Sequence, residues 1–346
     1  MSSVAAVDCG TNSIRLLISN VLALEDGEVQ LLDIERRMEV VRLGQGVDRT
    51  GAFAPEALER TFTVLREYAE LMRDNGVELG PDAVRMAATS ATRDASNRQE
   101  FIDGVREILG IEPEIISGDE EAELSFVGAT AEIEAAGAPQ GAETAGGAPV
   151  QRPFLVVDTG GGSTEFVLGY AEADEAGAVR AARSVDVGCV RLTERHFTTD
   201  PPAEDQVAAA RADIDAALEE AARTVPLDDA ATVVCVAGTA TTVAGIALDL
   251  PSYDAERIHH TWVSARRMGE ISRELLAMPH EQRAAIGVMH PGRVDVIAAG
   301  ALVLERVMVR TGAGGFLTSE HDILDGLAWS LCLPDPEDEE SDVSGP

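Results

Sequence analysis

Residues 154–170 constrain this chain more than any other stretch, because two short apolar runs there enclose a glycine-rich turn. Apolar runs on both sides of such a turn predict a β-hairpin, whereas dinucleotide and P-loop sites need a helix after the glycines. The chain also contains no lysine, so the P-loop lysine is absent. The turn and its edges supply Asp158, Gly160, Gly161, Gly162, Ser163 and Glu165.

A hairpin turn of this composition can bind phosphate. Glycine leaves backbone N–H groups open to an anion, and the hydroxyl of Ser163 adds a further donor. Asp158 and Glu165 flank the turn, and carboxylate oxygens are the ligands that Mg²⁺ prefers. We therefore predict a phosphate loop with a divalent cation beside it.

The same pattern occurs once more, 150 residues earlier in the chain. Four pairs of positions coincide, and they are Val7/Val157, Asp8/Asp158, Gly10/Gly160 and Ser13/Ser163. A single glycine turn between two strands is common and would mean little. Two copies with matching positions predict an internal duplication, in which two halves face each other across a cleft and each contributes a phosphate loop.

The composition narrows the classes of function. A chain of 346 residues with 45% apolar and 25% charged residues suits a globular protein of two domains. Its net charge of −34 argues against binding to nucleic acid or to an anionic membrane, since both need a basic field. All 27 basic residues are arginine, which suits bidentate phosphate contacts, although a GC-rich genome or a salty cytoplasm would give the same bias.

Cysteine usage and hydropathy predict a cytoplasmic protein. The cysteines are scattered with no C-x-x-C pair, which indicates free thiols in a reducing compartment; they are Cys9, Cys189, Cys235 and Cys332. The chain does not open with the pattern of a signal peptide. Its longest apolar stretch, residues 233–250, is interrupted by polar residues and does not resemble a membrane span.

Hydrophobic periodicity predicts an alternation of strands and helices. The expected strands lie near residues 4–7, 14–20, 29–41, 83–88, 179–187 and 232–237. The expected helices lie near residues 55–72, 99–109, 204–223, 291–310 and 319–331. Such an order is typical of an α/β fold.

Two polar turns follow predicted strands, at the edge of the sheet where α/β ligand sites lie. The first, residues 89–94, contains Arg93, which we expect either to contact a phosphate or to form an ion pair with Asp94. The second begins with Gly238 and Thr239 and leads into a helix. Its N–H groups, with the helix dipole behind them, predict another anion site.

Residues 117–124 predict a helix with one acidic side chain on its inner face. Ser117 and Glu120 form a capping-box pattern, so the helix begins there and Glu120 is engaged with the cap. At 3.6 residues per turn, Glu121 shares a face with Leu124 and is a candidate general base. The alternative is a run of acids that favours the positive end of the helix dipole.

The motifs resemble those of the exopolyphosphatase / guanosine pentaphosphate phosphatase family, which belongs to the superfamily of actin, sugar kinases and chaperone ATPases. The matching segments, in order, are residues 8–13, 90–93, 117–122, 158–165, 188–192, 238–242 and 293–295. The resemblance implies two ribonuclease-H-like lobes, at 1–135 and 152–312, around a phosphate-binding cleft. A flexible loop at 136–151 would join them, a last helix at about 319–333 would pack back onto the first lobe, and 335–346 would be a disordered acidic tail.

The resemblance also implies roles for individual residues. Glu121 would activate water and Arg93 would contact substrate phosphate, while Asp158, Glu165 and Asp8 would bind Mg²⁺ or Mn²⁺. A monovalent cation such as K⁺ is a candidate activator. Substrate phosphates would lie along Thr11, Asn12, Ser13, Gly160, Gly161, Gly162, Ser163, Arg191, Gly238 and Thr239. Residues 319–326 depart from the family pattern, so we assign them no catalytic role.

These inferences predict a hydrolase, namely a homodimeric exopolyphosphatase that removes terminal phosphate from short inorganic polyphosphate. Guanosine pentaphosphate is the alternative substrate. A phosphotransferase of the same superfamily would need pockets for an acceptor and for adenosine. A non-catalytic regulator driven by nucleotide is the third alternative, and it would need a partner-binding domain.

Overall fold

The computed structural model describes residues 2–23, 29–135, 150–170 and 179–332. The expected loop at 136–151 lies almost wholly outside these residues, and the expected acidic tail at 335–346 lies entirely outside them. No helix within the described ranges is long and apolar enough to cross a membrane.

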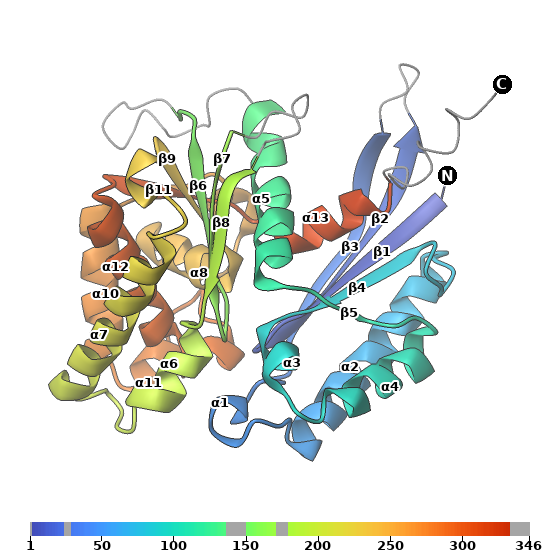
Figure 1. Cartoon of the computed structure of the whole chain (residues 1–346), viewed down its shortest axis with the longest axis horizontal. Helices are drawn as coiled ribbons and strands as arrows, with labels where there is room; N and C mark the ends of the chain where they lie inside the picture. Colours follow the sequence, from blue (N-terminus) through green and yellow to red (C-terminus); the bar gives the residue numbers. More distant parts are fainter. Residues whose placement is uncertain (1, 24–28, 136–149, 171–178, 333–346) are drawn as a thin grey trace.

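The first sheet has the strand order β3-β2-β1-β4-β5. Its strands are β1 (Ser2–Cys9), β2 (Ser13–Ala23), β3 (Val29–Val40), β4 (Val84–Ala88) and β5 (Glu114–Ile115). Helices α2 (Pro55–Asp74) and α4 (Arg98–Leu109) cover one face of it (Figure 1). Leu65 and Phe101 of these helices are fully buried against Val7 and Leu16 of the sheet, which forms the core of the first lobe.

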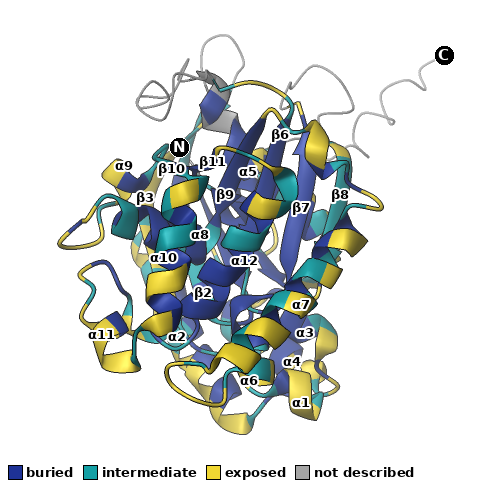
Figure 2. Cartoon of the chain, turned by 90° about the vertical axis from the view of Figure 1, so that its left-hand side faces the viewer, coloured by how far each residue is buried: buried dark blue, intermediate teal, exposed yellow. Residues whose placement is uncertain are grey.

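The second sheet has the order β10-β11-β9-β6-β7-β8. Its strands are β6 (Phe154–Thr159), β7 (Thr164–Gly169), β8 (Val179–Val185), β9 (Thr232–Val236), β10 (Trp262–Ser264) and β11 (Gly315–Thr318). Every residue of β6, β7 and β9 is buried, as expected of strands covered on both faces (Figure 2).

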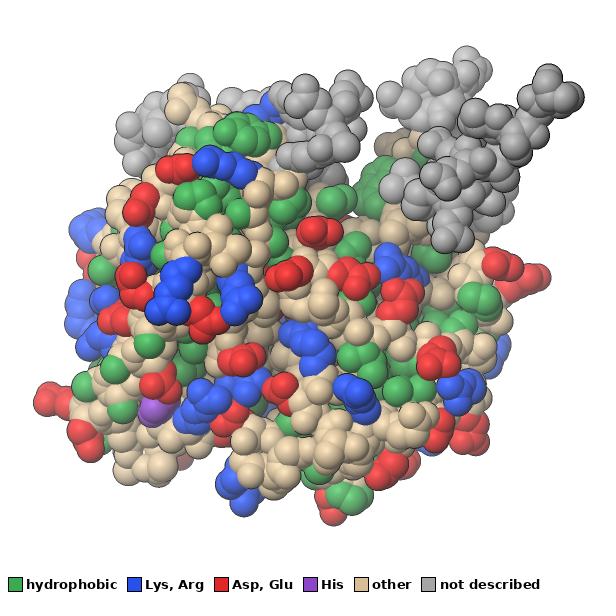
Figure 3. All heavy atoms as spheres, in the orientation of Figure 1, with side chains coloured by type: hydrophobic (Ala, Val, Ile, Leu, Met, Phe, Trp, Pro, Cys, Tyr) green, Lys and Arg blue, Asp and Glu red, His purple; other side chains and the backbone are tan. Residues whose placement is uncertain are grey.

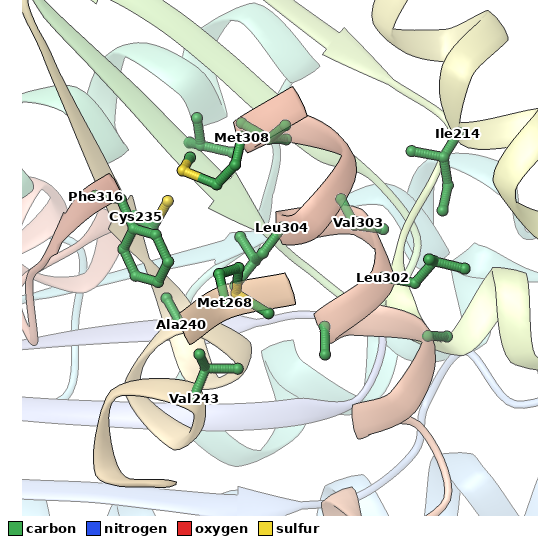
Figure 4. Close-up of a cluster of buried hydrophobic side chains, with 14 of the residues drawn as sticks. Ile214, Cys235, Ala240, Val243, Met268, Leu302, Val303, Leu304, Met308 and Phe316 are labelled. Carbon is green, nitrogen blue, oxygen red and sulfur yellow. The ribbon is translucent and has the colours of Figure 1, made fainter. Parts of the chain in front are cut away.

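Helices cover both faces of the second sheet. One face carries α6 (Cys189–His196), α7 (Glu204–Ala221), α8 (Ala237–Ala247), α10 (Ala265–Ala277) and α12 (Ile297–Thr311), with the short α11 (His280–Ala284) nearby (Figure 1). The short α9 (Ala255–Ile258) contacts α8. Leu302, Leu304 and Met308 of α12 fill the core there together with Phe316 of β11 (Figure 4). Ala122 and Phe126 of α5 (Gly118–Ala135) pack on the opposite face.

The two sheets repeat one topology. In each, an antiparallel hairpin, β1–β2 or β6–β7, is followed by a strand parallel to its first strand, β4 or β9. Equivalent hydrogen bonds close the two turns, from Gly10 N to Ser13 O (3.0 Å) and from Gly160 N to Ser163 O (3.1 Å). The prediction of a duplicated α/β fold with two ribonuclease-H-like lobes is therefore confirmed.

The final helix, α13 (Ile323–Ser330), crosses back to the first sheet (Figure 1). Ile323, Leu324 and Leu327 are buried against Ala6 and Leu17 of that sheet. The helix also packs closely on α5, so it is wedged between α5 and the first lobe.

Four local predictions need correction. Residues 89–94 were predicted as a turn, but Ser90–Asp94 form the short helix α3, because the turn closes with helical hydrogen bonds onto Thr89. The last two helices begin at Ile297 and Ile323, and not near residues 291 and 319. Ser117 does cap α5 through the Glu120 N–H (3.1 Å), but the Glu120 carboxylate turns outward to Arg85 (3.4 Å), which offers it an opposite charge.

Candidate functional site

The two hairpin turns and the start of α8 meet around a pocket of about 80 Å³ between the lobes. Most of the predicted site residues line it: Asp8, Thr11, Asn12, Ser13, Glu121, Asp158, Gly160, Gly161, Ser163, Gly238 and Thr239. The predicted residues Gly162, Glu165, Arg93 and Arg191 lie behind the lining, and their contacts are described below. Residues separated by more than 200 positions in sequence are thus brought together at one point.

Backbone N–H groups from both turns form an anion cradle. The amides of Thr11, Asn12 and Gly161, which line the pocket, donate to no protein acceptor among the described residues. The turns also touch, since a Cβ on Gly162 would lie 2.4 Å from the hydroxyl oxygen of Ser90 and 2.8 Å from that of Thr11. A side chain at position 162 would displace these hydroxyls, and the open amides can hold the oxygens of an anion.

The start of α8 forms a further wall of the pocket. Ala237 has a positive φ of 65°, a strained conformation for alanine that is typical of functional turns. A Cβ on Gly238 would lie 2.1 Å from Arg293 Cζ, so the glycine lets this arginine approach the backbone. The first N–H groups of a helix lack intrahelical acceptors, which makes this end of α8 attractive to anions.

Arg293 is a pocket residue to which the sequence analysis gave no role. Its guanidinium donates to Gly238 O (3.2 Å) and to Thr242 Oγ1 (3.3 Å), and it makes no salt bridge to any described carboxylate. Burial lowers the pKa of Arg293, and the nearby charge of Glu320 offsets this effect only in part. An arginine that lines this pocket and makes no direct salt bridge to a described carboxylate is suited to binding an anion. The sequence feature that could have indicated a role for Arg293 is its position in the 293–295 motif.

Glu121 lies on the inner face of α5 and is buried, as its helical register predicted. Arg93 donates to Glu121 Oε2 (2.8 Å) and to Ile116 O (3.0 Å), so it holds the carboxylate and does not reach into the pocket. Burial nevertheless raises the pKa of Glu121 to about 7 against the effect of Arg93. A carboxylate with this pKa can accept a proton near neutral pH.

Three other predicted carboxylates surround Glu121. Burial raises the pKa of Asp158 to about 6, and Ser125 donates to its Oδ2 (2.8 Å). Burial, together with the charges of Glu121 and Asp158, raises the pKa of Glu165 well above its usual range. Asp8 is likewise raised in pKa by burial. The group carries more negative charge than the protein itself balances.

The chemistry of this group fits a hard divalent cation. Asp8 Oδ1 and Glu165 Oε2 are buried and have no hydrogen-bond partner among the described atoms. Within the same residues, no three acidic, histidine or cysteine side chains form a complete metal cage. Mg²⁺ does not need one, because it commonly binds one or two carboxylates and completes its shell with water and substrate phosphate. The site thus offers part of a coordination shell beside a phosphate pocket.

Arg191 contacts the phosphate turn from outside the pocket. Its Nε donates to Gly162 O (2.7 Å), while its two terminal nitrogens bind Asp48 (2.7 Å) and Asp94 (2.6 Å) of the first lobe. Asp94 is therefore the partner of Arg191 and not of Arg93. In this structure Arg191 ties the second-lobe turn to the first lobe.

The raised pKa of Glu121 predicts a pH-dependent stability in the absence of divalent cations. A carboxyl group whose pKa is higher in the folded state than its ordinary 4.5 binds protons more tightly when folded. Its contribution to stability is therefore present below pH 4.5 and is lost as the pH rises through about 7. We expect Glu121→Gln to gain stability relative to the wild type over this window, by up to about 3 kcal/mol. Urea unfolding at pH 5 and pH 8 in chelator measures it, and a pH-independent difference between the two proteins would contradict it.

Comparison with known proteins agrees with this geometry. Two duplicated lobes with paired glycine turns define a protein of the actin-like ATPase superfamily, and a buried carboxylate facing those turns is suited to phosphoryl hydrolysis. Residues 21–311 match the Ppx/GppA phosphatase family, and the chain belongs to that family.

Similar proteins cover nearly the whole chain. Exopolyphosphatase 2 of Mycobacterium tuberculosis is 48% identical over 341 residues, which are 96% of this chain and 99% of that protein. The crystal structure of an exopolyphosphatase-like protein is 40% identical, with a TM-score of 0.82 over 94% of this chain and 98% of the other. The Ppx/GppA family member of Aquifex aeolicus is 26% identical, with a TM-score of 0.71 over 99% of both chains. The prediction of a hydrolase of this family is confirmed.

Proposed function

We propose that the protein is an exopolyphosphatase that hydrolyses the terminal phosphoanhydride bond of short inorganic polyphosphate. The observation that carries this proposal is the buried Glu121 carboxylate, which faces an anion cradle built from two phosphate loops. The similarity to Exopolyphosphatase 2 supports the choice of substrate.

The geometry supports a direct attack by water. Glu121 accepts a proton from water while the new O–P bond forms, and the bridging O–P bond breaks to release the shortened chain. Arg93 orients Glu121 through Oε2. The turn amides and Arg293 hold phosphate oxygens, where they offset charge that develops in the transition state.

We propose Mg²⁺ or Mn²⁺ as the cofactor. Asp8 and Asp158 would contribute oxygen ligands from the pocket wall, with Glu165 directly behind, since Asp158 and Glu165 are opposite each other in the β6–β7 ladder. When bound, the cation would offset the negative charge of the substrate and of the carboxylate group. K⁺ stays a candidate activator.

A second groove favours guanosine pentaphosphate as an alternative substrate. It has a volume of about 640 Å³ and shares Arg15, Ala237, Gly238 and Arg293 with the phosphate pocket. Its remaining lining includes the apolar or aromatic residues Met38, Tyr253, Val288, Met289, Pro291 and Leu324. A base could lie against this lining while the phosphates occupy the pocket, which inorganic polyphosphate does not require.

Phosphate release from short polyphosphate, guanosine pentaphosphate and ATP, measured in parallel, tests the proposal. We expect the highest kcat/KM with short polyphosphate. A higher value with guanosine pentaphosphate would transfer the assignment to that substrate. Consumption of ATP that depends on an added acceptor would indicate a phosphotransferase, and no turnover of any of them would favour a regulator.

Chain length provides a further prediction. Acidic and arginine side chains alternate over the visible face, with no continuous basic track (Figure 3), and the net charge is −34. Outside the pocket and the adjoining groove, which Arg36 and Arg37 also line, phosphates meet a net negative surface and are repelled, more strongly at low salt, where screening is weak. We expect distributive cleavage of long chains, with activity that improves as the ionic strength rises moderately. Gels of partly digested long chains should show a smear of intermediates, whereas loss of full-length material without intermediates would contradict it.

Compartment and assembly are part of the same proposal. The four cysteines are free thiols, as predicted, which supports a reducing compartment such as the cytoplasm. A second copy of the chain is the proposed partner, and light scattering would test the homodimer.

A further inference from the structure

The N-terminal end of α13 reaches the phosphate pocket, although the sequence analysis gave this segment no role. Ile323 lines the pocket, and the preceding Asp322 is buried. Asp322 caps α13 by accepting a hydrogen bond from the Leu324 N–H at Oδ1 (3.1 Å). Its other oxygen, Oδ2, accepts a hydrogen bond from Arg15 Nη1. The cap thus uses one oxygen, and the second is directed to the active-site side.

Arg15 connects Asp322 to Asp8. The two residues Asp8 and Arg15 are directly opposite in the β1–β2 ladder, so their side chains share a face of the sheet. Arg15 donates to Asp8 Oδ2 through both Nε (2.9 Å) and Nη2 (2.7 Å). Asp8 Oδ1 keeps no protein partner among the described atoms and is buried beside the pocket. The guanidinium therefore fixes one oxygen of Asp8 and leaves the other for a ligand.

The backbone of Asp322 is fixed as well. Gly128 of α5 lies so close that a Cβ there would be 1.9 Å from Asp322 O. A Cβ on Gly326 of α13 would be 2.3 Å from Leu124 O of α5. Helix α5 also carries Glu121. The contact between α5 and α13 therefore fixes the positions of both Glu121 and Asp322.

We propose that Asp322 is a positioning residue, which acts through Arg15 to hold the Asp8 carboxylate with Oδ1 directed to the cation and phosphate site. Stability alone does not account for the Asp322–Arg15 pair, because a buried ion pair contributes little net stability and the cap needs only one oxygen. The role given to Asp8 rests on the proposed function, whereas the contacts that join Asp322, Arg15 and Asp8 are features of the structure itself.

The test variant is Asp322→Asn. An asparagine can cap Leu324 with its oxygen, but its NH₂ group then faces the Arg15 guanidinium, and two donors cannot bond each other. Loss of an outer-shell partner of this kind commonly costs 10–100-fold in metal affinity or activity. We expect that loss in kcat/KM on short polyphosphate and in the affinity for Mn²⁺, the latter measured by calorimetry with Mn²⁺ alone.

Asp325→Asn is the matched control. Asp325 is another buried carboxylate of the same region, and it does not line the pocket. It binds Arg36, His321 and the Asp322 N–H, and asparagine keeps an oxygen that can accept from that N–H. Both variants remove one negative charge beside α13, and their unfolding midpoints separate folding defects from site defects. We expect Asp325→Asn to keep kcat/KM and Mn²⁺ affinity within twofold of the wild type.

A double-mutant cycle with Arg15→Gln tests whether Asp322 acts on Asp8 through Arg15. If Asp322 acts through Arg15, then Asp322→Asn adds little to the loss that Arg15→Gln already causes. Fully additive losses would overturn the proposal, as would an Asp322→Asn protein within twofold of wild type in both measurements. If the wild type does not hydrolyse polyphosphate, the proposed function fails, and Mn²⁺ calorimetry alone decides. Equal Mn²⁺ affinity in wild type and Asp322→Asn, or no Mn²⁺ binding by either, then overturns the positioning role.

Discussion

Replacing Glu121 with glutamine is expected to lower kcat by roughly 10²–10⁴-fold, while KM changes little. The side chain keeps its size, and its carbonyl oxygen can still accept the hydrogen bond from Arg93. It can no longer accept a proton near neutral pH, so water must be deprotonated without a general base. Steady-state phosphate release with short polyphosphate measures the effect, and the outcome that excludes Glu121 from the mechanism is an unchanged kcat.

Glu120→Gln is the matched control for this experiment. It makes the same chemical change one position earlier on α5, at a carboxylate that is half-exposed and paired with Arg85. A general loss of charge at the start of α5 would lower the activity of both variants. The structure instead predicts a large loss for Glu121→Gln and a change of less than about twofold for Glu120→Gln, because surface ion pairs contribute little.

The sequence was sufficient for features that depend on local pattern. The hairpins around Asp8 and Asp158 follow from apolar runs and glycines that are adjacent in the chain, and their repetition implied the two lobes. The inward register of Glu121 followed from the helical period and the Ser117 cap. In each case the residues that determine the structure lie within about one turn or one hairpin of each other.

Side-chain partners across the fold could not be predicted in this way. Arg93 was expected to meet phosphate or Asp94, but its partner Glu121 is 28 residues away. Arg191 finds Asp48 and Asp94 across the interface of the lobes. Asp322 and Arg15 are separated by 307 residues, and nothing local to either indicates the pair. From the sequence alone, several arginines are equally plausible ion-pair partners for each carboxylate, and the tertiary packing determines which of them it contacts.

Replacing Gly128 with alanine is expected to destabilise the protein and to impair the active site together. The added methyl group would lie 1.9 Å from Asp322 O and 2.7 Å from Asp322 C, both backbone atoms that cannot rotate away. Helices α5 and α13 must therefore separate, and overpacking of this kind typically costs about 1–3 kcal/mol in unfolding free energy. Since Glu121 lies on α5 and Asp322 caps α13, we also expect a fall of roughly 10-fold or more in kcat/KM.

Gly269→Ala in α10 is the control that separates packing from helix propensity. A Cβ on Gly269 would meet no atom within 4 Å, so the substitution makes the same chemical change inside a helix without a clash. Alanine favours a helix over glycine by about 0.5–1 kcal/mol, and this variant should be slightly more stable than the wild type with unchanged activity. Urea unfolding and kcat/KM of both variants distinguish the cases. The contact between α5 and α13 leaves no room for a methyl group at Gly128. If Gly128→Ala had the same unfolding free energy and kcat/KM as Gly269→Ala, then this contact would not be what positions Glu121 and Asp322.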